Sequence, residues 1–257
     1  MTKSAVYTHS YTLTAGESNA EGRMPLTLVA ERVIEVATEH ANALGIGYAA
    51  LITKNIGWVL SRMSIEMYRY PVINDQYNLS TWIESYNRHF SNRNFRMTDS
   101  NGNVIGYMRT VWVAMDFASR SIADISSFER DSFPIADVEC PIERTPRLRT
   151  PDSERVQSSE YTFKYCDLDF NRHVNTIRYL HLILNHWPLE HYDKFTAARF
   201  DILFHHECHF GQTVRLLVEE EGKHADCAIV LPEHTAINAA ITWRHVKSAC
   251  PALQTKN

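Results

Sequence analysis

Glycine and proline are scarce in this chain of 257 residues, which contains nine of each. Together they make up about 7% of the sequence, against an average near 12%. Hydrophobic residues account for 44%. These values exclude collagen-like, low-complexity and intrinsically disordered sequences. At roughly 150 residues per domain, the length predicts one large domain or two small ones.

Long apolar runs are also missing. The longest, Ala43–Ile52 counted with its glycines, is far shorter than the roughly 18 residues that a membrane-spanning helix needs. The first part of the chain carries no basic-then-apolar pattern typical of a signal peptide. We therefore expect no membrane span and a cytoplasmic protein.

Paired cysteines and an excess of basic charge are missing as well. The five cysteines are widely spaced and form no C-x-x-C pair, which is not typical of a disulfide framework. The net charge of −4 argues against a dedicated nucleic-acid-binding protein. The sequence thus predicts reduced cysteines and no nucleic-acid partner.

The order of predicted elements repeats once along the chain. A helix that starts at Pro25 and stops at Gly45 precedes several strands, the first over Trp58–Tyr70. A second helix, Val174–Trp187, precedes another set, the first over Thr196–His209. We expect an α+β fold in which a curved antiparallel sheet wraps each long helix and the two sheets join. The predicted division is an N-terminal unit at 1–138, a basic, proline-containing connector at 139–157 and a C-terminal unit at 158–257.

The densest polar cluster lies between a predicted strand and the second long helix, at 167–175. It offers a carboxylate, an amide and an imidazole within five residues, from Asp169, Asn171 and His173. The dipole of the following helix favours negative charge that develops near its N-terminus. A loop that only caps the helix is the alternative, because Asp and Asn also satisfy free amides there.

Histidines are crowded in the second half, where ten of the 13 follow residue 170. His205, Glu207 and His209 alternate along the predicted strand and would present three metal ligands on one face. This spacing matches no recognised metal motif, so we predict no metal there. Cys208 would face the other way, which favours a core role over that of a nucleophile.

The first strands of the two halves correspond at an offset of 140 when Tyr70-Pro71 is aligned with Phe210-Gly211. Met63, Ile65 and Met67 then correspond to Leu203, His205 and Glu207. The first half also lacks the polar cluster, because Gly22-Arg23-Met24-Pro25 precedes its helix. The two halves share a pattern of elements but differ in chemistry.

The residues Asp-Leu-Asp-Phe-Asn-Arg-His-Val-Asn at 167–175, with His-His-Glu-Cys at 205–208, resemble the C-terminal unit of acyl-acyl-carrier-protein thioesterases. Weaker similarity covers the first half, at Trp58–Arg62, Arg69–Pro71, Thr81-Trp82 and Val111–Met115. The resemblance implies a tandem, or double, hotdog fold. It also implies hydrolysis of fatty acyl thioesters on acyl carrier protein without a cofactor. The catalytic residues that it implies are Asp169, Asn171, His173 and Glu207.

Thioester hydrolysis needs an activated water, a donor to the carbonyl oxygen and a proton for the leaving thiolate. We assign water activation to Glu207, and polarisation or positioning of the thioester to His173 and Asn171. Asp169 would orient its neighbours within the loop. The choice of Glu207 or His173 as the general base stays open.

The N-terminal unit is the predicted pocket for the acyl chain. Met63, Ile65 and Met67 would line it, since methionine side chains adapt to an apolar ligand. Because acyl carrier proteins are acidic, the exposed basic residues near the entrance, Arg172 and Arg178, are the predicted docking residues.

Two other functions stay open: an acyl-coenzyme A thioesterase on the same fold, and a non-catalytic acyl-binding protein. The four polar residues argue against the second, because a pocket for an apolar chain has no need of them. Acyl-chain length does not follow from the sequence, and either a monomer or a homodimer is compatible with it.

Overall fold

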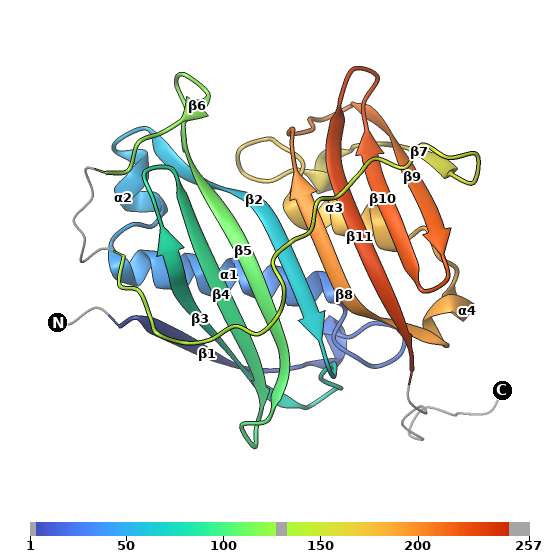
Figure 1. Ribbon diagram of the computed structural model, residues 1–257, viewed down its shortest axis with the longest axis horizontal. Helices are drawn as coiled ribbons and strands as arrows, with labels where there is room; N and C mark the ends of the chain where they lie inside the picture. The colour runs from blue at the N-terminus through green and yellow to red at the C-terminus, as the bar shows by residue number, and fades with distance from the viewer. Residues whose placement is uncertain (1–3, 127–132, 247–257) are drawn as a thin grey trace.

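The computed structural model describes residues 4–126 and 133–246, whose strands form one antiparallel sheet (Figure 1). The first half contributes strands in the order β1-β3-β4-β5-β2, and the second half continues as β8-β11-β10-β9-β7, while β6 pairs with β5. Read outward from the seam between β2 and β8, the two orders match strand for strand. Each half is therefore one hotdog unit, and the expected tandem hotdog fold is confirmed. The strands are β1 (Val6–Thr12), β2 (Ile56–Met67), β3 (Gln76–Tyr86), β4 (Phe90–Asp99), β5 (Val104–Asp116), β6 (Ser121–Ile122), β7 (Gln157–Thr162), β8 (Phe195–Phe204), β9 (Thr213–Glu221), β10 (His224–Val230) and β11 (Thr235–His245).

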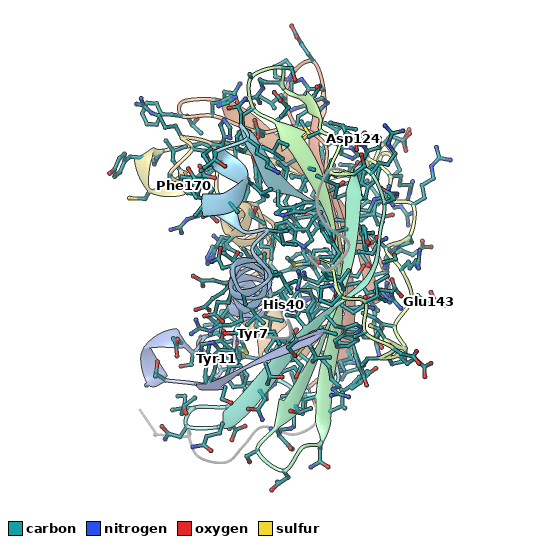
Figure 2. The ribbon with its side chains drawn as sticks, turned by 90° about the vertical axis from the view of Figure 1, so that its left-hand side faces the viewer. Tyr7, Tyr11, His40, Asp124, Glu143 and Phe170 are labelled. Carbon is teal, nitrogen blue, oxygen red and sulfur yellow. The ribbon has the colours of Figure 1, made fainter. Side chains whose placement is uncertain are left out.

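Helix α1 (Leu26–Leu44) packs against the sheet of the first unit and begins and ends as predicted. Pro25 caps its start, and Gly45 ends it with φ 76°, a left-handed conformation that glycine adopts without strain. Apolar residues of α1 at helical spacing, such as Val29 and Val33, are fully buried. Figure 2 shows the helices on one side of the sheet and the connector on the other, with Phe170 and Glu143 labelled on these opposite sides.

The corresponding helix of the second unit, α3 (Thr176–Leu184), is shorter than predicted. Its start is fixed by Asn175, whose side chain accepts a hydrogen bond from the backbone N–H of Ile177 at 2.9 Å. Each long helix is followed by a short one that the sequence did not predict, α2 (Tyr48–Ile52) and α4 (Leu189–Tyr192). Within 4–126 and 133–246, no helix is long and apolar enough to cross a bilayer.

The two units join where β2 pairs with β8, from Arg62 opposite Leu203 to Glu66 opposite Arg199. At the centre, Ser64 lies opposite Asp201, and its hydroxyl donates to the Asp201 carboxylate at 2.5 Å.

Both central side chains are buried, so the Asp201 carboxylate needs internal donors. Arg199 supplies a second one, with its Nε 2.7 Å from Asp201 Oδ2. The connector closes this network on the outer face, where the hydroxyl oxygen of Thr145 lies 2.7 Å from Ser64 Oγ.

The predicted offset of 140 between the units is wrong by three residues. The Met24 amide donates to the Pro71 carbonyl at 2.9 Å, and the Val174 amide donates in the same way to the Cys208 carbonyl at 2.8 Å. Pro71 therefore corresponds to Cys208, which is an offset of 137. Consequently Tyr70, and not Met67, corresponds to Glu207.

With the offset of 137, Ser64 corresponds to Asp201, which is its own partner across the seam. The approximate two-fold axis that relates the units therefore passes through this pair. Met63 then corresponds to Phe200 and Ile65 to Ile202, so the apolar row on β2 matches an apolar row on β8.

The predicted strand Thr196–His209 is also wrong at its C-terminal end, because β8 ends at Phe204. Beyond it, the amides of His205 and His206 both donate to the carbonyl of Ala236, at 2.9 and 3.3 Å. This shared acceptor ends the regular ladder. The side chains of 205–209 therefore do not alternate between two faces as they would in a strand.

A buried guanidinium lies between α1 and the sheet of the first unit. Arg93 on β4 is 4% exposed, and its Nη1 lies 2.7 Å from His40 Nδ1 on α1. Because arginine can only donate, His40 Nδ1 must accept, and His40 Nε2 then donates to the carbonyl of Ser4 at 3.0 Å. Burial and the nearby Arg93 lower the pKa of His40 to about 4.

This arrangement predicts a loss of stability in weak acid. An unfolded His40 takes up a proton near pH 6.5, whereas the folded chain resists it until about pH 4. The stability contributed by neutral His40 is therefore complete above pH 6.5, and about 3 kcal/mol of it is lost as the pH falls to 4. Urea denaturation of wild type and His40→Asn across this range measures the effect.

The asparagine side chain of this variant retains an acceptor for Arg93 but does not titrate. We expect His40→Asn to be less stable at pH 7, and its stability to depend less steeply on pH between 6.5 and 4. Parallel curves for the two proteins would contradict the assignment.

Candidate active site

The loop before α3 is organised around the carboxylate of Asp169. Its Oδ1 accepts hydrogen bonds from the backbone amides of Asn171 at 2.8 Å and His173 at 3.1 Å. The Asp169 amide in turn donates to the His173 carbonyl at 2.8 Å. Arg172 adopts a left-handed conformation with φ 66°, which closes the turn. These hydrogen bonds fix the backbone of His173 and so restrict where its side chain can lie.

His173 faces the segment that follows β8. Its Nδ1 lies 3.2 Å from Glu207 Oε1, and its backbone forms an antiparallel bridge with His209. The rings of His173 and His209 meet edge to face, with centroids 5.1 Å apart. An acid–base pair of a half-buried imidazole and a carboxylate therefore forms between residues that are 34 positions apart.

The N-terminal unit completes this site. Arg120, in the turn between β5 and β6, donates from Nη2 to the second oxygen of Glu207. On another side of the loop, Tyr48 of α2 meets Phe170 edge to face at 5.6 Å. The site therefore lies between the two units, and both contribute to it.

The two halves of the chain match two family models, the acyl-ACP thioesterase N-terminal domain over residues 4–129 and the C-terminal domain over residues 151–245. The chain belongs to the acyl-ACP thioesterase family. The resemblance found at 167–175 and 205–208 is thereby confirmed.

Several curated relatives in this family come from plants. The oleoyl-acyl carrier protein thioesterase of Coriandrum sativum is 29% identical over 251 residues, which are 87% of this chain and 63% of that protein. Oleoyl-acyl carrier protein thioesterase 1 of Arabidopsis thaliana is 27% identical over 223 residues, 79% of this chain and 60% of that protein. Both are named as chloroplastic. The chain thus spans about 60% of the length of these relatives.

Solved structures of acyl-ACP thioesterases share the fold. That of Bacteroides thetaiotaomicron superimposes with a TM-score of 0.87 at 28% identity, covering 93% of this chain and 98% of that one. The 12:0-ACP thioesterase of Umbellularia californica has a TM-score of 0.79 at 20% identity, covering 94% of each chain.

Among the four side chains that the family resemblance implies, three are tied together by direct contacts. Asp169 holds the backbone of His173, and His173 contacts Glu207. Asn171 lies in the same loop, where it is exposed and its side chain makes no hydrogen bond within the described residues. Arg120 was not predicted, because nothing in the sequence relates a turn of the first unit to a residue 87 positions later.

The other predicted residues lie farther from this pair. Met63, Ile65 and Met67 are at most 1% exposed and belong to the core that β2 shares with α1. Their role in an acyl-chain pocket stays a prediction. Arg172 and Arg178 are exposed at the start of α3, and their role in docking likewise stays a prediction.

Cys208 is fully buried, and its amide donates to the hydroxyl of Tyr179 at 3.0 Å. Burial raises the pKa of the Cys208 thiol and so disfavours the thiolate that a nucleophile needs. Burial therefore supports the core role of Cys208, whereas the strand alternation first used to argue it does not apply beyond Phe204.

His205, Glu207 and His209 do not form the row on one face that was considered as a possible set of metal ligands. His205 Nε2 lies 2.8 Å from Asn238 Oδ1, while His209 packs against His173. In the part of the chain that the structure describes, no three His, Cys, Asp or Glu side chains gather closely enough to hold a metal ion.

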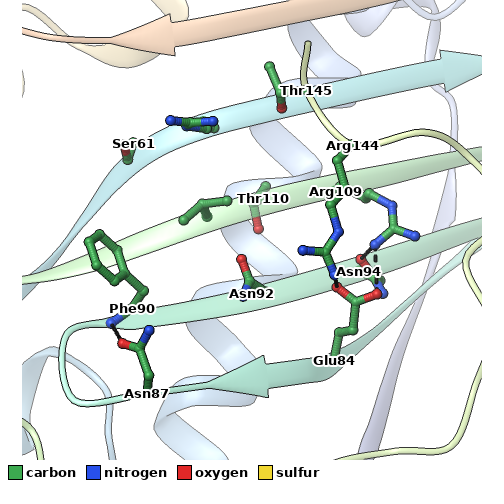
Figure 3. Close-up of a pocket in the computed structure, with 12 residues that line it drawn as sticks. Ser61, Glu84, Asn87, Phe90, Asn92, Asn94, Arg109, Thr110, Arg144 and Thr145 are labelled. Atoms are coloured by element: carbon green, nitrogen blue, oxygen red, sulfur yellow. Dashed lines mark hydrogen bonds and ion pairs between the residues drawn. The ribbon is translucent and has the colours of Figure 1, made fainter. Parts of the chain in front are cut away.

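A polar cavity of about 320 Å³ lies under the connector, on the face of the first sheet opposite the helices (Figure 3). Three of its four charged groups are already paired, because Glu84 accepts from Arg109 at 2.8 Å and from Arg144 at 3.4 Å. This cavity is separate from the pair His173 and Glu207.

The loop geometry predicts different outcomes for two substitutions of Asp169. Asp169→Ala removes the acceptor of two amides and should lower the free energy of unfolding by about 1–2 kcal/mol. Asp169→Asn should lower it by less than about 0.5 kcal/mol, since an amide oxygen can accept both bonds. Urea denaturation compares the variants. Equal losses for Ala and Asn would show that the carboxylate charge, and not its acceptor geometry, holds the loop.

Proposed function

We propose that this member of the acyl-ACP thioesterase family hydrolyses fatty acyl thioesters of acyl carrier protein and releases the free fatty acid, which ends fatty acid synthesis. The contact of His173 Nδ1 with Glu207 Oε1 at 3.2 Å carries the proposal, because it supplies an acid–base pair beside Asn171. The names of the relatives support the substrate class. The cytoplasmic location stays a prediction.

Both oxygens of Glu207 are engaged, one by Arg120 and the other by His173 Nδ1. If Nδ1 carries the proton, the other ring nitrogen of His173, Nε2, is an acceptor. We therefore assign proton removal from water to His173, in place of the Glu207 assigned from the sequence, and orientation of the His173 ring to Glu207. The carboxylate also stabilises the imidazolium that forms.

The water then attacks the carbonyl carbon of the thioester, and its proton passes to His173. Negative charge develops on the carbonyl oxygen, where the side-chain amide of Asn171 can donate a hydrogen bond. The C–S bond breaks as the carbonyl reforms, and the imidazolium returns the proton to the leaving thiolate. Asp169 takes part only by holding the loop.

Arg120 is a positioning residue in this proposal. It contacts Glu207 through the carboxylate oxygen that His173 does not contact, and so restrains the carboxylate. A carboxylate held at both oxygens has few rotamers left, so the imidazole keeps one orientation.

The N-terminal unit, at 1–138, would hold the acyl chain, and the C-terminal unit, at 158–257, supplies the reacting side chains. On β2, Met63 lies opposite Ile202 of the catalytic unit. Met67 lies four residues, or about 13 Å, farther along the strand and away from Glu207. Among the proposed pocket residues, Met63 is therefore the first that acyl chains of increasing length would reach.

Arg172 and Arg178 would receive the acidic carrier protein. Both are exposed at the loop and first turn of α3, so they flank the proposed entrance to His173. Exposed charges act mainly by steering an oppositely charged partner toward the site.

The proposal is tested by hydrolysis of acyl chains of graded length, each linked in parallel to acyl carrier protein and to coenzyme A. We expect the carrier-linked substrates to react faster. His173→Ala and Glu207→Gln should each lower kcat by about a hundredfold or more, the scale of one acid–base group. The exposed residues His224 and Glu160 provide matched controls, His224→Ala and Glu160→Gln.

Arg120→Gln should lower kcat by less than Glu207→Gln, because it loosens the pair without removing it. Near wild-type hydrolysis by folded His173→Ala and Glu207→Gln would refute the catalytic assignment. Faster hydrolysis of the coenzyme A series would favour an acyl-coenzyme A thioesterase, and no hydrolysis of either series a binding protein.

The order of the methionines along β2 predicts chain selectivity. Met63→Trp should shift the preferred acyl chain to shorter lengths, and Met63→Ala to longer ones, because the side chain would limit the depth of the pocket. Met67→Trp should change the preference less. Thermal unfolding identifies variants that fold, and hydrolysis of the graded series measures the preference. Unchanged selectivity in folded Met63 variants would exclude this wall of the pocket.

A further inference from the structure

A second cavity, of about 580 Å³, lies between the two units where α1 begins and α3 ends. This volume is within the range of small-molecule binding sites. Aromatic rings of the second unit form much of its wall, from Trp187, Tyr192, Phe195 and Trp243. His173 and Glu207 lie beyond the opposite end of α3, so the cavity is separate from the proposed catalytic site.

The loop at this cavity repeats the loop of the catalytic site at an offset of 150. Asn19 Oδ1 accepts from the Arg23 amide at 2.9 Å, as Asp169 Oδ1 does from the His173 amide. The Asn19 amide also donates to the Arg23 carbonyl at 2.9 Å. Gly22, with φ 69°, takes the left-handed place of Arg172. The cavity is thus the counterpart of the catalytic site under the approximate two-fold axis.

The side chains at this counterpart lack the acid–base pair. Arg23 stands in the place of His173, and Tyr70 in the place of Glu207. The Tyr70 hydroxyl donates to the carbonyl of Ala197 at 2.9 Å, and burial raises its pKa. The counterpart positions therefore lack the imidazole and carboxylate that form the proposed catalytic pair.

One aromatic residue of the wall has a shielded N–H without a partner in the described part of the chain. Trp243 is 4% exposed, and its indole Nε1 has no acceptor among the described residues. Its counterpart in the first unit, Trp112, donates to Thr110 Oγ1 at 2.8 Å. Ile241 takes the place of Thr110 in the second unit, so the indole of Trp243 is left free.

Arg23 is a cationic donor on the wall of the cavity. It is half-buried and forms no ion pair within 4–126 and 133–246. Glu21 lines the same cavity, but burial raises the pKa of its carboxyl, against the lowering effect of the Arg23 charge. The wall therefore combines aromatic surface with a cation that can donate to an anionic oxygen.

We propose that this cavity is a second, non-catalytic binding site for a free fatty acid, whose chain packs on the aromatic wall and whose carboxylate is bound by Arg23. The proposal rests on the proposed function in one respect, since a fatty acid is the expected product. A molecule that leaves the catalytic end would then be able to rebind at the other end of the α1–α3 pair.

Calorimetric titration of the full chain with dodecanoate tests this site. We expect a binding event that weakens about tenfold or more in Arg23→Gln, because a charge-assisted hydrogen bond is lost. Arg215→Gln, the same change on an exposed part of β9, should leave it unaltered. Thr196→Trp, which fills the cavity from β8, should abolish it. Methyl dodecanoate should bind this site about tenfold more weakly than the acid.

If dodecanoate does not bind, or if its binding does not change in Arg23→Gln and Thr196→Trp, the proposed site is wrong. Equal affinity for acid and methyl ester would overturn the role of the carboxylate. Hydrolysis of acyl carrier protein thioesters by the same preparations separates the two proposals. Hydrolysis without this binding refutes the second site alone, whereas this binding without hydrolysis refutes the proposed function alone.

Discussion

The pairing of β2 with β8 around Ser64 and Asp201 is the contact on which the rest of the molecule depends. It makes two half-sheets into one, sets α1 beside α3 in opposite directions, and brings the turn at Arg120 to Glu207. A buried carboxylate at its centre is costly unless donors satisfy it, and Ser64 and Arg199 do so in this register. A slip of the seam would leave Asp201 without Ser64, so the network specifies how the units join.

This approximate symmetry creates two equivalent ends, and fusion in one chain lets them differ. In a homodimer of single units, both ends would carry the same residues. Here one end holds Asp169, His173 and Glu207, while the other holds Asn19, Arg23 and Tyr70 on the same backbone. The loop hydrogen bonds are retained at both ends because they stabilise the start of a helix. The reactive side chains are present only at one end, which separates the role of the loop in folding from its role in chemistry.

The sequence predicted what depends on local signals. Pro25 and Gly45 bound α1 because their backbone preferences act at the helix ends themselves, and the polar cluster before α3 follows from capping and composition. The end of β8 was missed because it is set by the carbonyl of Ala236, on another strand. The offset is wrong because the sequence suggests that Tyr70-Pro71 and Phe210-Gly211 end equivalent strands, and the backbone hydrogen bonds do not support this equivalence. Arg120 has no local signal at all.

The contact between Arg120 and Glu207 is exposed, at 64% and 36% of the two side chains, so water screens it and its contribution to stability is at most about 1 kcal/mol. A contact this weak cannot be what holds the units together, since the buried seam already does so. Its effect is on orientation: it restricts the rotamers of a carboxylate whose side-chain torsions would otherwise be free. Because the restraint comes from the first unit and the imidazole from the second, the pair is oriented only when both units are joined in this register.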